Sequence, residues 1–201
     1  MQRSLILSAC ILLFLTLGCH QGRATHTDGA RCIVEGGGPF PGFLAGVWRN
    51  EELGWEFTFE PDGSISSVVI SLGRIRLKPG EVAEIPMIKG GKGVFTPGDW
   101  EAYYTPSTRE LTVKVSVKDF RIEVADNILE GKSADVFLGE ISEDGKTWQT
   151  VWTSFPDYMA HTLDVANFEM KADPEYGNQQ DLTFKKVETP TRETTGLAAP
   201  F

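Results

Sequence analysis

The fold is decided most clearly by residues 111–124, which read LTVKVSVKDFRIEV. Apolar and polar side chains alternate strictly from Leu111 to Val117, which is the period of a strand with one buried face and not of a helix. Two polar residues then follow in succession, and the apolar role passes to the even-numbered positions from Phe120 onward. One extra residue would restore the pattern, so we predict a β-bulge near 118–119 that bends a long strand.

The same alternation extends over most of the chain and is divided by turn signals. Trp55, Phe57 and Phe59 alternate with polar residues, and a second change of parity surrounds Gly73. Turn-forming residues recur between these stretches, at Pro61-Asp62-Gly63, Lys78-Pro79-Gly80, Lys89-Gly90-Gly91, Pro97-Gly98, Thr105-Pro106-Ser107 and Asp144-Gly145. Their spacing predicts an all-β fold of eight or nine antiparallel strands, arranged as an up-and-down barrel or, alternatively, as a β-sandwich. The changes of parity favour the barrel, because strands that close on themselves need bulges or glycines.

The alternation is lost over residues 156–180. One short helix is predicted there from the spacing of four residues, Leu163, Ala166, Asn167 and Met170. A helix at this place, before a last strand at about 181–188, is compatible with a small barrel.

The composition narrows the class of protein. The 201 residues are 41% apolar and 23% charged, which excludes a collagen-like, coiled-coil or fully disordered chain. Three cysteines are too few for a disulfide-dense scaffold. The 28 acidic residues outnumber the 19 basic ones and give a net charge of -9. This balance argues against a nucleic-acid partner, because phosphate binding needs a basic surface.

The N-terminus has the pattern of an export signal. A positive start is followed by residues 5–17, of which 11 of 13 are apolar. This run is too short for a membrane-spanning helix, which needs about 20 residues. It ends in Leu15-Thr16-Leu17-Gly18-Cys19, which resembles the lipobox of bacterial lipoproteins. The resemblance implies an exported protein of the bacterial cell envelope, held on a membrane by acyl chains on Cys19. The alternative is an ordinary signal peptide with a cysteine near its end.

These features divide the chain into four parts. Residues 1–18 are predicted as the lipoprotein signal peptide, residues 19–42 as the lipidated cysteine and a flexible tether, residues 43–188 as the β domain and residues 189–201 as a disordered tail. Cys32 falls in the predicted tether without a partner, so we treat it as incidental.

The start of the predicted domain carries a family resemblance. Gly46-Val47-Trp48, followed by the hairpin of residues 54–63, resembles the entry to a lipocalin-like (calycin) domain. In that family the Trp of Gly-x-Trp closes one end of the barrel, often under a basic side chain of the last strand. The resemblance implies that Trp48 closes the barrel here, with Lys185 or Lys186 as its basic partner.

Residues 142–148 carry a second resemblance. Their sequence, Ser-Glu-Asp-Gly-Lys-Thr-Trp, looks like the hairpin common in discoidin-type carbohydrate-binding sandwiches. The simpler interpretation is that Asp144-Gly145 makes a tight turn before a strand, and we favour it because nothing else in the chain supports the discoidin class.

No motif for catalysis or metal binding is present in the sequence. His161 is the one histidine of the predicted domain, and no His, Cys and Asp cluster has metal-ligand spacing. Asp99 with Glu101, or Glu123 with Asp126, could form a carboxylate pair for glycoside hydrolysis. Solvated strand faces explain such acids more simply, so we predict no catalytic residue, metal or cofactor.

The aromatic residues are the remaining candidates for a binding site. Six of them fall on predicted strands and would pack the core or line a ligand cavity: Trp55, Phe57, Trp100, Tyr104, Trp148 and Trp152. The sequence therefore predicts a non-enzymatic, lipid-anchored protein that binds a small apolar or amphipathic ligand. The alternatives are a carbohydrate- or envelope-binding β-sandwich and a hydrolase that uses paired carboxylates.

Overall fold

The computed structural model describes residues 30–71, 74–87, 91–125, 127–161 and 168–188. Within these residues, twelve strands form a single sheet. They are β1 (Cys32–Val34), β2 (Gly46–Arg49), β3 (Glu56–Phe59), β4 (Ile65–Ile70), β5 (Ile75–Leu77), β6 (Ala83–Met87), β7 (Gly91–Thr105), β8 (Glu110–Val124), β9 (Asn127–Ile141), β10 (Thr147–His161), β11 (Phe168–Lys171) and β12 (Asn178–Lys186). The described residues contain no helix longer than the three-residue 3-10 turn Glu35–Gly37. None of their helices is long and apolar enough to cross a membrane.

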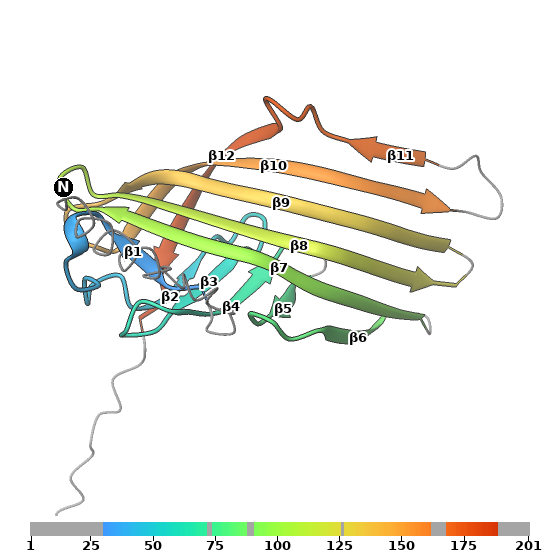
Figure 1. Cartoon of the computed structure of the whole chain (residues 1–201), viewed down its shortest axis with the longest axis horizontal. Helices are drawn as coiled ribbons and strands as arrows, with labels where there is room; N and C mark the ends of the chain where they lie inside the picture. Colours follow the sequence, from blue (N-terminus) through green and yellow to red (C-terminus); the bar gives the residue numbers. More distant parts are fainter. Residues whose placement is uncertain (1–29, 72–73, 88–90, 126, 162–167, 189–201) are drawn as a thin grey trace, which may run out of the picture.

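Four long neighbouring strands, β7 to β10, form the central part of the sheet (Figure 1). Each has 15 residues, which corresponds to about 50 Å of extended chain. The predicted bulge is confirmed, because the pairing of β8 with β9 shifts between Val117 and Phe120. A second irregularity lies in β7 between Pro97 and Trp100. These bulges bend the long strands midway along their length.

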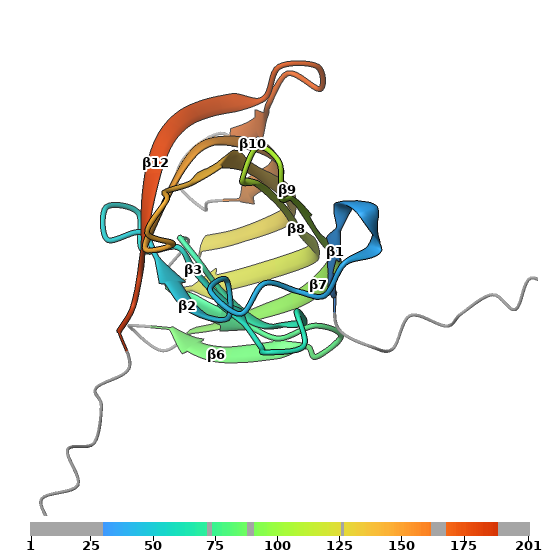
Figure 2. The same cartoon turned by 90° about the vertical axis from the view of Figure 1, so that its left-hand side faces the viewer.

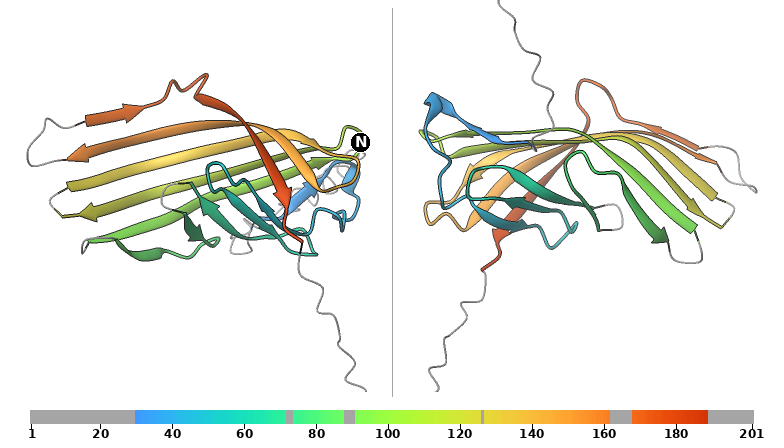
Figure 3. Two further views of the ribbon diagram at one scale, coloured as in Figure 1. Left: turned by 180° about the vertical axis from the view of Figure 1, so that it is seen from behind. Right: turned by 60° about the horizontal axis from the view of Figure 1, so that its bottom comes forward.

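The strands β12, β2, β3, β4 and β5 roll the sheet around one half of these long strands (Figures 2 and 3). The last strand, β12, pairs with β10 on one side and with β2 on the other, and the sheet continues through β3, β4 and β5. In the described part of the chain β5 and β6 form no ladder with each other, so the sheet is open between them. The all-β prediction is confirmed. The sheet is not closed into a barrel, and one continuous sheet takes the place of the two that a sandwich needs.

Two segments that were predicted as a helix and as a tether form strands instead. They do so because parts of the edges of the long strands β7 and β10 have no other strand to pair with. Among the described residues the helix prediction is wrong, because Met170 lies in β11. This strand pairs with the part of β10 that β12 does not cover. Leu163, Ala166 and Asn167 lie outside the described residues. On the other side of the sheet, β6 pairs with β7 only as far as Phe95. Closer to its C-terminal end, β7 pairs in parallel with β1. Exposed edges need such cover.

The predicted tether therefore differs from the structure over residues 30–42, part of which forms β1. Cys32 is buried beneath this pairing, and burial raises the pKa of its thiol to about 12. A thiol with so high a pKa is a poor nucleophile at neutral pH.

The core fills the rolled half of the sheet with aromatic rings. Phe137 lies at its centre, with its ring centroid 4.9 Å from that of Trp55 and 5.0 Å from that of Phe57. Trp148 and Phe184 pack beside them with centroids 4.9 Å apart. All five side chains are at most 2% exposed. Large rings thus occupy the interior at this end of the sheet.

An ion-pair cluster holds β2, β3 and β5 together on the outer face. Glu56 is buried, and its carboxylate accepts hydrogen bonds from Arg49 and Arg76. Burial alone would raise the pKa of Glu56, but the hydrogen bonds and charges of the two arginines outweigh it and lower the pKa. The cluster therefore stabilises the fold while Glu56 is ionised.

We expect Glu56→Gln to destabilise the protein by about 1–2 kcal/mol at pH 7, a value reduced by the solvent exposure of both arginines. Because the folded-state pKa is the lower one, this difference should shrink as the pH falls below the ordinary carboxyl value of 4.5. Urea unfolding at pH 7 and pH 3 measures it. Glu175→Gln, on an exposed turn, is the control, and an equal loss at both pH values would contradict the ion-pair role.

Candidate functional site

A cavity of about 270 Å³ lies where the aromatic core gives way to the open half of the sheet. Residues from β4, β7, β8, β9, β10 and the start of β12 line it, together with Trp55, which directly precedes β3. Five of the lining side chains are aromatic: Trp55, Phe95, Phe120, Trp152 and Tyr158. The cavity is therefore mainly an aromatic one, placed at the mouth of the packed interior.

Strand alternation and the bulge explain which side chains reach this cavity. Trp152, Ser154 and Tyr158 are separated by even numbers of residues along β10. Their side chains therefore lie on the same face of the strand, the one that lines the cavity. In β8 the bulge reverses the parity, so that Phe120 lines the cavity although it is an odd number of residues from Val117. The Phe120 ring packs on those of Phe95 and Tyr158, with centroids 6.0 and 6.3 Å away.

Asp135 of β9 is the one acidic residue among the described residues that line the cavity, and it is only 5% exposed. Its Oδ1 accepts a hydrogen bond of 2.9 Å from Trp152 Nε1, and its Oδ2 accepts one of 3.3 Å from Ser133 Oγ. Burial raises the pKa of Asp135, and the hydrogen bonds from Ser154, Trp152 and Ser133 oppose the rise. No lysine, arginine or histidine forms an ion pair with it in the described part of the chain.

Trp55 contributes a polar group that is not satisfied by the protein. Its Nε1 is buried and has no hydrogen-bond partner among the described residues. Trp148 Nε1 and Thr150 Oγ1 share this property, but neither residue lines the cavity. A buried donor without an acceptor costs about 1–3 kcal/mol, so an acceptor atom brought by a ligand would stabilise Trp55.

Two of the six aromatic candidates from the sequence line the cavity, namely Trp55 and Trp152. Phe57 and Trp148 are fully buried in the core. Trp100 donates a hydrogen bond from Nε1 to the Ser116 carbonyl oxygen, and Tyr104 packs edge-on against Phe43. The sequence-based choice missed Asp135 and Phe120. Asp135 shares the parity of Phe137 and Ile141, so an acid on the buried face of β9 was the available signal.

Trp48 and the two lysines lie where the last strand, β12, pairs with β2. Trp48 is fully buried and donates a hydrogen bond of 2.8 Å from Nε1 to the Leu44 carbonyl oxygen. Lys186 is its direct partner across β2 and β12, and its Nζ donates to the Phe43 carbonyl oxygen at 2.6 Å. Lys185 pairs with Arg49 instead. Of the two predicted partners, Lys186 is thus the one on the same face as Trp48.

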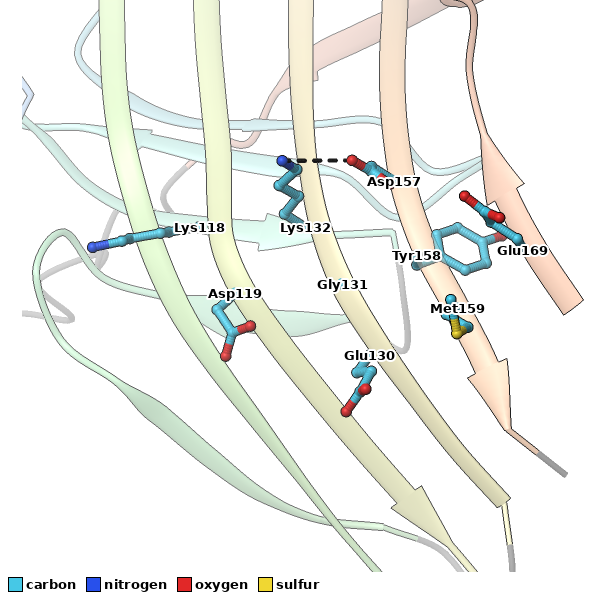
Figure 4. A pocket seen from close by; sticks show the side chains of 9 residues that line it. All are labelled: Lys118, Asp119, Glu130, Gly131, Lys132, Asp157, Tyr158, Met159 and Glu169. Atoms are coloured by element: carbon cyan, nitrogen blue, oxygen red, sulfur yellow. Dashed lines mark ion pairs between the residues drawn. The ribbon is translucent and has the colours of Figure 1, made fainter. Parts of the chain in front are cut away.

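A second hollow, which shares Tyr158 with the aromatic cavity, is lined mainly by charged side chains (Figure 4). Lys132 Nζ lies 3.5 Å from Asp157 Oδ2, and the other charged residues that line the hollow are Lys118, Asp119, Glu130 and Glu169. Charges of both signs are mixed on neighbouring strands here. This arrangement is typical of a solvated sheet face and does not select one class of ligand.

The other sequence candidates do not form a catalytic or metal site in the described structure. Glu101 pairs with Lys114, and Glu123 pairs with Arg121. Asp126 lies outside the described residues, as does Cys19. His161 Nε2 lies 3.4 Å from Glu130 Oε1 at the far end of β10. Among the residues described, no group of three or more His, Cys, Asp or Glu could hold a metal ion.

The hairpin of residues 142–148 forms the turn between β9 and β10. Asp144 Oδ1 accepts hydrogen bonds from Ser142 Oγ and from the Lys146 amide, and Gly145 takes the positive φ of 68° that the tight turn requires. The Trp148 ring that follows is fully buried. The glycan-binding alternative therefore lacks an exposed ring at this position.

The chain matches no known protein family, no curated protein and no solved structure. The function is therefore argued from the geometry of the aromatic cavity.

Proposed function

We propose that this protein binds a small ligand with an apolar body, without catalysis, in the aromatic cavity at the open end of the rolled sheet. The observation that carries the proposal is a cavity of about 270 Å³ lined by five aromatic rings and one buried carboxylate. Apolar walls with a few placed polar groups are the usual composition of a small-molecule site. Asp135 and the unsatisfied Trp55 Nε1 would orient the ligand.

The long half of the sheet gives room for a larger ligand than the cavity alone. A volume of 270 Å³ is slightly below the roughly 300–1,000 Å³ of drug-sized sites. Beyond Phe120 the inward positions of the long strands remain apolar, with Ile122 of β8 and Leu129 of β9 partly buried. An apolar tail that leaves the cavity would lie along these residues.

We also propose that the rolled half is an open form of the lipocalin-like barrel. The pairing of β12 with β2 and the placement of Lys186 opposite Trp48 support this relationship. Lipid anchoring at Cys19 and location in the bacterial envelope are further parts of the proposal, which rest on the lipobox resemblance alone. Retention of the wild type, and release of Cys19→Ser, in a membrane fractionation would test them.

Ligand binding is tested with N-phenyl-1-naphthylamine, a neutral fluorescent probe whose emission rises in apolar surroundings. We expect the probe to bind the wild-type protein, and Tyr158→Ala to weaken this binding about tenfold, since one ring contributes about 1 kcal/mol or somewhat more. Tyr103→Ala is the matched control, because Tyr103 lies outside the cavity and is 39% exposed. No binding by the wild type, or equal loss in both variants, would overturn the proposal.

A further inference from the structure

The described residues that line the cavity include an acid but no basic residue. Among the described residues that line it, Asp135 is the only acid, and none is a lysine, arginine or histidine. Tyr158 is the one other titratable side chain of this described lining, and the lining residues from β4, β7, β8 and β12 are neutral. A ligand at this place therefore meets a carboxyl group that no basic side chain neutralises.

The hydrogen bonds around Asp135 favour its ionised form, but burial outweighs them and raises its pKa, so a cation beside the carboxyl group would stabilise the ionised form. Trp152 Nε1 and Ser133 Oγ donate to different carboxylate oxygens, and both are neutral groups. Three neutral donors, including Ser154, favour the ionised form but supply no counter-ion. A buried carboxylate is stabilised much further by a cation placed next to it.

The aromatic rings add a second attraction for positive charge. The Trp55 and Trp152 rings meet at an angle of 62° with centroids 6.0 Å apart, and Trp152 also donates to Asp135. Phe95, Phe120 and Tyr158 form a connected group that lines the same cavity. Ring faces attract organic cations, and groups of rings are the usual recognition site for quaternary ammonium ions.

We propose that the cavity selects an organic cation, namely an amine or quaternary ammonium group on an apolar body, with its charge beside Asp135. This inference rests on the ligand-binding function proposed above and adds the ligand class to it. A neutral ligand would not supply the counter-ion that the ionised form of Asp135 lacks, and burial would continue to raise the pKa of this group. A carboxylate ligand, such as a fatty acid, would bring a second negative charge next to it without a basic residue to bind either.

The test compares three probes that share one alkyl chain and differ in charge: decyltrimethylammonium, decanol and decanoate, each below its micelle concentration. Displacement of N-phenyl-1-naphthylamine at pH 7, with calorimetry as a second measurement, gives their affinities. We expect the cation to bind the wild-type protein at least tenfold more tightly than decanol, and decanoate to bind most weakly. This order needs no variant, so a failure of a variant to fold does not affect it.

Asp135→Asn then assigns the preference to the carboxylate, because asparagine keeps the size and an acceptor oxygen for Trp152. We expect the variant to lose about tenfold in affinity for decyltrimethylammonium and to keep its affinity for decanol. Asp157→Asn is the matched control on the same sheet, since Asp157 does not line the aromatic cavity. It should leave all three affinities unchanged.

The outcomes separate the two proposals. If decanol binds as tightly as the cation, or if Asp135→Asn keeps the preference for the cation, the cation inference is overturned and the binding function stands. If none of the three probes nor the fluorophore binds the wild-type protein, both proposals are overturned.

Discussion

Phe137→Ala is expected to destabilise the protein by about 3–5 kcal/mol, the range for removal of a buried aromatic side chain. Phe137 is fully buried in β9 at the centre of the aromatic core. Its ring packs on five others, those of Trp55, Phe57, Trp148, Trp152 and Phe184, with centroids 4.9–6.4 Å away. Rings from β3, β10 and β12 thus lose a shared partner, and the close packing around them prevents full collapse of the void.

Urea unfolding followed by tryptophan fluorescence measures this loss. The matched control is Phe43→Ala, because Phe43 is 41% exposed and its ring meets that of Tyr104 edge-on at a centroid distance of 5.9 Å. We expect this variant to lose less than about 1 kcal/mol. A loss of similar size in both variants would show that the core of the rolled half is not the main source of stability.

Gly139→Ala should be at least as disruptive, and we expect a loss of about 3 kcal/mol or more, or no folded protein. Gly139 lies in β9 between Leu111 of β8 and Thr150 of β10. An added Cβ would overlap the Gln149 carbonyl oxygen and press on the Thr150 backbone. Backbone atoms of a paired strand cannot rotate away as a side chain can, so β9 and β10 would have to separate.

Gly42→Ala is the matched control for this effect, since a Cβ at Gly42 would meet no atom within 4 Å and its backbone is not in the left-handed region. It should change the stability by less than about 0.5 kcal/mol. Circular dichroism and thermal unfolding compare the two variants. A Gly139→Ala protein as stable as the wild type would contradict the close approach of β9 to β10.

Local patterns predicted the strands well because they depend on the period of the residues alone. The alternation around Val117 and Phe120 predicted both the strand and its bulge, and the pairing of β8 with β9 confirms the bulge. The helix prediction that included Met170 was wrong for a different reason. Its segment forms a strand because β10 offers an unpaired edge, and this edge exists only once the long sheet is built.

The candidate site was predicted only in part, for a related reason. Trp55 and Trp152 were selected as large rings on strands, and both line the cavity. Phe57 and Trp148 have the same pattern but are enclosed by Phe137 and Phe184. Which rings fill the interior and which border empty space depends on how far each strand extends into the rolled half.

The sequence by itself determined the class of fold, the bend in β8 and the absence of a recognisable catalytic motif, since each follows from residue type and spacing along the chain. Only the tertiary structure decided that the sheet stays open between β5 and β6 and that Asp135 meets Trp152 beside an aromatic cavity. Asp135 is one of 28 acidic residues. Its burial without a counter-ion results from contacts between strands that are distant in the sequence, and no local pattern records such contacts.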